Sequence, residues 1–224
     1  MKRIPASRHI VIDEDKFLLA SPTAAFPQHA TRSALPNHKE GTLTSNFENV
    51  LKLVLQEEGG FCKDPEHMGG MANLGVTQRI WEAYVGHEVN ELTMRTLSPA
   101  DVAPLYRQNY WNRVHGDKLP LGVDYAVMDF AVKCGTSRTA KTLQGICGVE
   151  QNGSLGPETM QAVHSADPVA LIDAICDRRL AFLQTLPSFT VFGKEWSARV
   201  ARVRAESERM LQQTPEVGIS QRQG

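Results

Sequence analysis

The sequence has no long apolar run and no excess of charge of one sign. None of its hydrophobic stretches approaches the roughly 18 residues that a membrane-spanning helix needs, so no membrane span is expected. The basic residues number 24 and the acidic residues 25, which gives a net charge of −1. Because binding to nucleic acid depends on clustered positive charge, nucleic acid is not an expected partner.

The four cysteines in 224 residues are ordinary usage and show no paired spacing. The sequence contains no Cys-X-X-Cys pair and no Cys/His spacing typical of a metal site, so neither a metal nor another cofactor is expected. The basic residues Lys2 and Arg3 are not followed by the apolar segment of about 7–15 residues that a secretory signal contains. We therefore expect synthesis in the cytoplasm, with reduced thiols, and arrival at any outer compartment by non-standard export or by lysis.

Hydrophobic periodicity changes at about residue 45. Residues 1–44 contain several prolines and no sustained period, which predicts an extended or disordered arm. From there on, most segments have the 3.6-residue period of amphipathic helices. Glycine-rich turns interrupt this pattern over residues 61–75 and indicate a loop or a small hairpin. The predicted fold is mainly α, with a small hairpin or loop lobe.

Capping signals mark the starts of several helices. Ser45 and Glu48 fit a capping box, and Gly59 ends the helix that they begin. Ser98 before Pro99 predicts another helix start. The first helix has one apolar face, formed by Phe47, Val50, Leu51, Val54 and Leu55. Further helices are predicted from Thr77, over about 121–134 and 136–146, from Pro157, from Pro168 and over about 194–211.

Glu58 is the candidate for acid–base chemistry. It lies at the C-terminal end of the first predicted helix, where the helix dipole disfavours a carboxylate by about 0.3–1 kcal/mol. This field and any burial raise the pKa of a carboxyl group, and a carboxylic acid that stays protonated can act as a general acid. Gly59 and Gly60 leave room for a substrate. The alternative is a solvated acid at an ordinary helix end, and the residues alone leave both open.

Charged residues in the C-terminal half have structural interpretations. Asp129 lies in an apolar helical pattern, which predicts a buried, hydrogen-bonded structural acid. Arg179 and the cations of residues 199–204 are expected on a solvated helix face.

Residues 58–77 combine closely spaced glycines with acidic residues and read Glu-Gly-Gly-Phe-Cys-Lys-Asp-Pro-Glu-His-Met-Gly-Gly-Met-Ala-Asn-Leu-Gly-Val-Thr. This stretch resembles the opening signature of glycoside hydrolase family 108, which reads Glu-Gly-Gly-Tyr, Asp-Pro, Asp, Gly-Gly, Thr-Asn and Gly-Ile-Thr. Further matches follow in the same order at residues 110–132, 143–159 and 189–196. The resemblance extends over about residues 46–210.

The resemblance implies a lysozyme-like fold, in which a helical bundle and a small lobe line a cleft. It also implies N-acetylmuramidase activity, the hydrolysis of the β-1,4 bond between N-acetylmuramic acid and N-acetylglucosamine of peptidoglycan, with Glu58 as the general acid. The implied domains are a catalytic lobe over residues 45–118, a helical peptidoglycan-binding-like part over 119–212 and a flexible tail over 213–224.

Three polar positions depart from the family pattern. His67 stands where the family usually has Asp, Ala72 where it has Thr, and Lys133 where it has Asn. In related phage lysozymes, an acid and a Thr near these places position the attacking water. A neutral His67 can still accept a proton from that water, because the unperturbed pKa of histidine is about 6.5. We therefore expect His67 as the second catalytic residue, and weak activity because Ala72 cannot hold the water.

The resemblance also indicates residues that contact the glycan, namely Asp64, Asn73, Tyr110 and Trp111. For Asp64 the alternative is a turn before Pro65, and for the two aromatic residues it is packing in the core.

The sequence leaves two functions open. The first is a peptidoglycan hydrolase, such as an endolysin, which would need a holin as partner. The second is a catalytically degenerate muramidase that binds peptidoglycan or helps to assemble a secretion system, in the manner of a secretion activator. In both cases peptidoglycan strands in the periplasm or cell wall are the expected partner.

Overall fold

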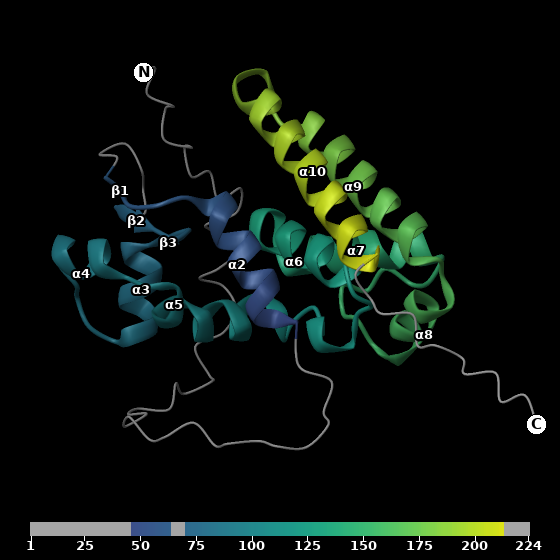
Figure 1. Cartoon of the computed structure of the whole chain (residues 1–224), viewed down its shortest axis with the longest axis horizontal. Helices are drawn as coiled ribbons and strands as arrows, with labels where there is room; N and C mark the ends of the chain where they lie inside the picture. Colours follow the sequence, from purple (N-terminus) through teal and green to yellow (C-terminus); the bar gives the residue numbers. More distant parts are fainter. Residues whose placement is uncertain (1–45, 64–69, 213–224) are drawn as a thin grey trace, which may run out of the picture. The chain divides into compact units, whose positions relative to one another are not determined.

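The computed structural model describes residues 46–63 and 70–212 (Figure 1). The described chain forms two compact units, which separate at Arg113. Residues 133–135 return to the first unit, and the second unit contains the rest of the chain from Val114 onward. The predicted arm, the predicted tail and the candidate residues Asp64 and His67 lie outside the described residues.

Helix α2 (Phe47–Glu58) is the first described helix of the first unit. Its N-cap is Asn46, and no side chain caps the helix by a hydrogen bond. The helix therefore begins one residue later than a capping box at Ser45 would place it. The predicted apolar face is confirmed, because all of its residues are buried: Phe47, Val50, Leu51, Val54 and Leu55.

A small antiparallel sheet follows α2 and confirms the predicted hairpin. Its strands, in spatial order, are β1 (Cys62–Lys63), β2 (Met71–Asn73) and β3 (Val76–Thr77). The turn between β2 and β3 consists of Leu74 and Gly75, with φ angles of 52° and 75°. Two consecutive positive φ angles define a type I′ turn, which matches the twist of paired strands. The turn therefore needs glycine at one position and strains the backbone of leucine at the other.

The first unit continues with α3 (Gln78–Val85), α4 (Glu91–Thr96), α5 (Pro99–Tyr106) and the π-helical turn η1 (Arg107–Trp111). The predicted start of α5 is confirmed, because Ser98 and Asp101 form a reciprocal capping box. Helix α4 was not predicted, since six residues are too few to show a period. The π-helical turn was not predicted either, and such turns are frequently found at functional sites.

The second unit is helical and includes the paired helices α9 and α10, which lie side by side along their length (Figure 1). Its elements are η2 (Gly116–Lys118), α6 (Val123–Cys134), α7 (Thr136–Cys147), α8 (Pro157–Ser165), α9 (Pro168–Gln184) and α10 (Phe189–Gln212). The last two residues of α6 belong to the first unit. Helix α10 begins well before the predicted start near Lys194, because its first turn packs the ring of Phe189 against Gly193.

A buried ion cluster lies in the core of the second unit. Asp129 is 0% exposed and accepts hydrogen bonds from the guanidinium groups of Arg179 and Arg199, each at 2.5 Å. Burial alone would raise the pKa of Asp129, but the two guanidinium charges outweigh it and hold that pKa well below its usual range. The geometry agrees with the predicted structural acid.

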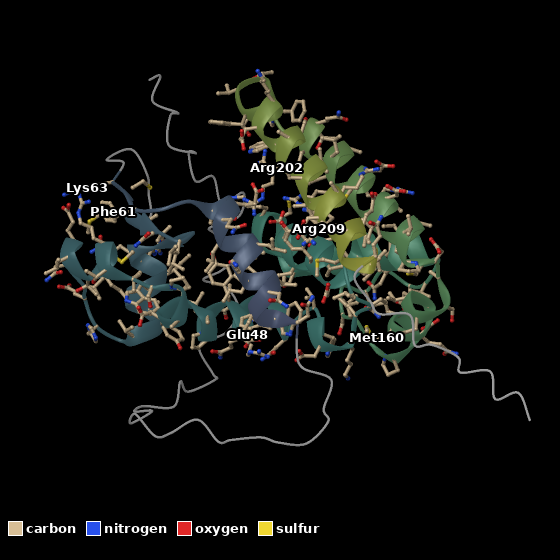
Figure 2. The ribbon with its side chains drawn as sticks, viewed as in Figure 1. Glu48, Phe61, Lys63, Met160, Arg202 and Arg209 are labelled. Carbon is tan, nitrogen blue, oxygen red and sulfur yellow. The ribbon has the colours of Figure 1, made fainter. Side chains whose placement is uncertain are left out.

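The prediction that Arg179 and Arg199 lie on a solvated face is wrong. Both side chains are buried, because the carboxylate of Asp129 offers them a fully hydrogen-bonded partner in the core. Arg202 and Arg209 of α10, in contrast, are about half exposed and pair with Glu195 and Glu206 at the surface (Figure 2). None of the helices in the described ranges is long and apolar enough to cross a membrane.

Candidate active site

Glu58 is buried at the end of α2, with a relative exposure of 2%. The helix ends there because Gly59 adopts a φ of 78°. This placement does not fit the alternative of a solvated acid. A carboxyl group buried at the negative end of a helix is costly, so its neighbours determine what it can do.

Lys133 supplies the opposite charge at this position. Its Nζ atom donates a hydrogen bond to Oε2 of Glu58 at 3.0 Å. The lysine side chain is itself only 14% exposed. Both residues belong to the first unit, although 75 positions separate them in the sequence. The ion pair is therefore largely shielded from solvent, and salt screens it less than a surface pair.

The type I′ turn approaches Glu58 very closely. A Cβ atom at Gly75 would lie 2.8 Å from Cγ of Glu58 and 2.5 Å from the hydroxyl oxygen of Tyr106. Only glycine fits here, because of both this contact and the positive φ angle. Tyr106 fixes the turn by donating a hydrogen bond from its hydroxyl to the backbone carbonyl of Leu74 at 2.9 Å. The end of α2 and the tip of the hairpin are thereby held together.

Tyr110 adds a second aromatic ring to the same neighbourhood. Its ring lies beside that of Tyr106, with 5.5 Å between the centroids. Burial raises the pKa of Tyr110, and the nearby charge of Glu58 raises it further, while Arg113 acts in the opposite direction. Tyr110 is half-buried and lies in the π-helical turn η1, so it is the predicted aromatic residue that remains accessible beside Glu58.

Trp111 and Asn73 have structural partners instead. Trp111 is 0% exposed and packs edge-on against Phe47, with ring centroids 5.5 Å apart. Of the two interpretations of this residue, the structure shows core packing. Asn73 is buried in β2, and its side-chain amide donates a hydrogen bond to the carbonyl of Met94 at 2.8 Å. Asn73 thus attaches the sheet to α4.

The remaining sheet positions offer little to a water molecule. Ala72 is buried in β2 and has no hydrogen-bonding side chain. Thr77, its partner across the sheet, uses its hydroxyl to accept the N–H of Ile80 at the start of α3. In the described segments, no group of three His, Cys, Asp or Glu residues is arranged to hold a metal ion.

A surface cluster stabilises the outer edge of the sheet, near the labels of Phe61 and Lys63 in Figure 2. Glu91 of α4 accepts hydrogen bonds from Lys63 of β1 at 2.6 Å and from Arg95 at 2.7 Å. The guanidinium of Arg95 also lies over the ring of Phe61, 4.0 Å from its centroid. These contacts hold β1, and with it the chain that leaves Glu58, against α4.

Comparison with known proteins identifies the family of the chain. The sequence model of glycosyl hydrolase 108 matches residues 51–135. The solved structure of SagA from Brucella abortus is similar to this chain, with 38% sequence identity and a TM-score of 0.68. The match covers 75% of this chain and 97% of SagA. The chain belongs to glycoside hydrolase family 108. No protein of curated function matches the sequence.

Membership of glycoside hydrolase family 108 confirms the predicted resemblance and the mainly α, lysozyme-like fold. The family indicates the hydrolysis of peptidoglycan as the activity to test for this chain. The matched segment contains Glu58 together with Gly75, Tyr106, Tyr110 and Lys133.

The contacts of Tyr106 with this group were not predicted from the sequence. A signal was present, because Asn-Leu-Gly between two short β-prone stretches is compatible with a tight hairpin turn. Nothing in the sequence connects that turn to a tyrosine 32 positions further along the chain.

Proposed function

We propose that the protein is an N-acetylmuramidase with Glu58 as its general acid. The substrate is the glycan strand of peptidoglycan, and the bond that breaks is the β-1,4 linkage between N-acetylmuramic acid and N-acetylglucosamine. The observation that carries the proposal is the position of Glu58, which is buried at a helix end beside a glycine turn, bonded to Lys133 and near Tyr106 and Tyr110. This arrangement lies within the segment that matches the family.

The reaction needs one proton to be given and one to be taken. Glu58 in its protonated form donates its proton to the glycosidic oxygen as the bond from that oxygen to the anomeric carbon breaks. A water molecule adds to the anomeric carbon on the other face of the sugar, and its proton passes to a base. We assign the base to His67, the polar residue that stands at the family position of the water-side acid.

The same proposal assigns the glycan contacts. Tyr110 is the aromatic ring beside Glu58 that remains partly accessible, and an aromatic face can stack on a sugar ring. Asp64 lies on the segment between β1 and β2 and is assigned to the same surface. Asn73 supports the site through its bond to α4, and Trp111 supports it from the core.

A second candidate function is a glycan-binding protein that no longer hydrolyses its ligand. The observation in its favour is Ala72, which is buried and cannot orient a water molecule. In that case the protein binds peptidoglycan, or helps to assemble a secretion system that crosses it. For the hydrolytic function, the partner that opens the way to the wall is a holin or an export system.

Digestion of purified sacculi distinguishes the two functions. We expect the wild type to release soluble reducing sugar and Glu58→Gln to release about 10²–10⁴-fold less, because glutamine keeps the shape and loses the proton. Glu48→Gln is the matched control, since Glu48 lies on the same helix with a side chain that is 75% exposed. If the wild type pelleted with sacculi and released nothing, the binding function would replace the hydrolytic one.

A further inference from the structure

The positive charge of Lys133 affects the pH range in which Glu58 can act as a general acid. A general acid must carry a proton before it can donate it. An ammonium group at hydrogen-bond distance stabilises the ionised form of a carboxyl group and so opposes that proton. Lys133 lies 3.0 Å from Glu58 and brings such an ammonium to this position. Asparagine can donate a hydrogen bond there without bringing a charge.

Other titratable groups belong to the same site, and the proposed function adds His67 and Asp64, which lie outside the described residues. Among the described residues, Tyr106 approaches from α5 and Tyr110 from η1, and both hydroxyls are neutral at ordinary pH. Arg113 acts on Tyr110 from the end of η1 and is itself exposed, and Glu57 is the acidic neighbour on α2. Burial of Glu58 favours its neutral form and opposes Lys133. Burial and Lys133 therefore act on the protonation of Glu58 in opposite directions.

We propose that Lys133 is a positioning residue that keeps Glu58 ionised in the resting enzyme and thereby confines hydrolysis of the glycan to acidic conditions. This inference rests on the proposed function of Glu58 as general acid. The geometry supports it, because the ammonium and the carboxylate are both shielded from water and their attraction is little weakened by solvent. The sign is fixed: removing the charge makes Glu58 hold its proton to higher pH.

The pH profile of sacculus digestion tests the proposal. Two variants remove the charge, Lys133→Asn with the family residue and Lys133→Gln with a longer amide. We expect both to move the alkaline limb of the kcat/KM profile upward by about 1–3 pH units, the effect of one close opposite charge. Lys133→Arg should leave the limb in place. Lys52→Gln, on an exposed position of α2, is the control for a general loss of positive charge.

A limb that stays in place in both amide variants overturns the proposal. A limb that also moves in Lys133→Arg overturns it too, because the effect would then come from packing and not from charge. Melting temperatures identify a variant that fails to fold. If one of the two amide variants fails to fold, the pH profile of the other one tests the proposal.

Carboxyl NMR of isotopically labelled protein separates this inference from the proposed function. The signal of Glu58 is assigned by its absence in Glu58→Gln. If no variant hydrolyses sacculi at any pH, the proposed function fails, but the titration still tests Lys133. A wild-type pKa below the ordinary value of about 4.3, which rises in Lys133→Asn, supports the proposal. A wild-type pKa near neutrality, or the same pKa in both proteins, contradicts it.

Discussion

Each of the two compact units contains a buried carboxylate that is paired with a cation, and the two pairs are built differently. In the second unit, Asp129 is held by two guanidinium groups that bond to both of its oxygen atoms. In the first unit, Glu58 is paired with the single ammonium of Lys133, whose flexible stem leaves it 14% exposed. The two guanidinium groups bond to both oxygen atoms of Asp129. Glu58, in contrast, lies next to a tight turn and a half-buried tyrosine.

This difference indicates what distinguishes a structural acid from a reactive one. Burial alone does not, since both carboxylates are buried. Two rigid guanidinium groups fix a carboxylate in its ionised form, because they occupy its lone pairs and hold its pKa low. The ammonium of Lys133 lies on a flexible side chain, so Glu58 can take up a proton and release it.

Removal of the carboxylate charge should affect stability much more in the second unit than in the first. We expect Asp129→Asn to lower the free energy of unfolding by about 3–5 kcal/mol, because it leaves two buried guanidinium groups without their counter-charge. Glu58→Gln should cost less, because Lys133 is partly exposed and the end of α2 disfavours the carboxylate that is removed. Denaturant unfolding followed by circular dichroism measures both. Asp173→Asn, which loses a surface pair with Arg204, is the control and should cost at most about 1 kcal/mol.

If Glu58→Gln destabilised the protein as much as Asp129→Asn, Glu58 would be a structural acid and the contrast between the two units would be wrong.

Two glycines with positive φ angles provide the next comparison. Gly75 and Gly122 have φ angles of 75° and 80°, so alanine is strained at either position by about 1–2 kcal/mol. Added methyl groups meet different neighbours. At Gly75 the neighbours are Tyr106 and Glu58, and at Gly122 the neighbour is the backbone carbonyl of Ser207. We expect Gly75→Ala to reduce the rate of sacculus hydrolysis about tenfold or more, because an increase of about 1.4 kcal/mol in the activation barrier lowers a rate tenfold.

Gly122→Ala should lower the melting temperature and leave the activity per folded molecule unchanged. Equal losses of activity in the two alanine variants would show that the turn above Glu58 has no special role.

The stability of the second unit should depend on pH through the ionisation of Asp129. The pKa of Asp129 is lowered on folding, so its ionised form stabilises the protein above the unfolded value of about 3.9. This contribution is lost as the pH falls through the lower value in the folded state. We therefore expect the difference in melting temperature between the wild type and Asp129→Asn to narrow steadily below about pH 4. A constant difference down to pH 2 would contradict the assigned ion cluster.

The smallest predicted effect concerns the water side of the reaction. We expect His67→Asp together with Ala72→Thr to raise the hydrolysis rate above that of the wild type. In the proposed mechanism both introduced side chains hold the same water molecule, so the effect of the pair should exceed the sum of the single changes by about 0.5–3 kcal/mol. Rates of sacculus digestion for the four proteins of the double-mutant cycle measure this coupling. A slower double variant would make His67 a true alternative catalyst.

The sequence predicted well what depends on neighbouring residues. The helix starts at Pro99 and Pro168 follow from the preceding residues, Ser98 and Asp167, whose side chains cap the backbone three residues ahead. The apolar face of α2 follows from the helical period. The position of Glu58 at a helix end was predictable for the same reason. Its catalytic assignment came from the resemblance to the family, because nothing local distinguishes it from a solvated acid.

Contacts between distant residues could not be predicted. Arg179 and Arg199 lie 50 and 70 positions from Asp129, and a helical arginine is ordinarily solvated. Lys133 reaches Glu58 from 75 positions away. Trp111 follows a half-accessible tyrosine in the sequence, and only the π-helical turn and the packing against Phe47 determine that the tryptophan faces the core.

The central claim is that Glu58 hydrolyses the bond after N-acetylmuramic acid, and the products of digestion test it most directly. Sacculi are digested with wild-type protein, and the soluble fragments are reduced with borohydride and analysed by mass spectrometry. Hydrolysis adds one water to each cleaved bond, so we predict fragments that end in reduced N-acetylmuramic acid, and about 10²–10⁴-fold fewer of them with Glu58→Gln. Fragments that end in anhydromuramic acid or in N-acetylglucosamine, or equal release by Glu58→Gln, would contradict the claim.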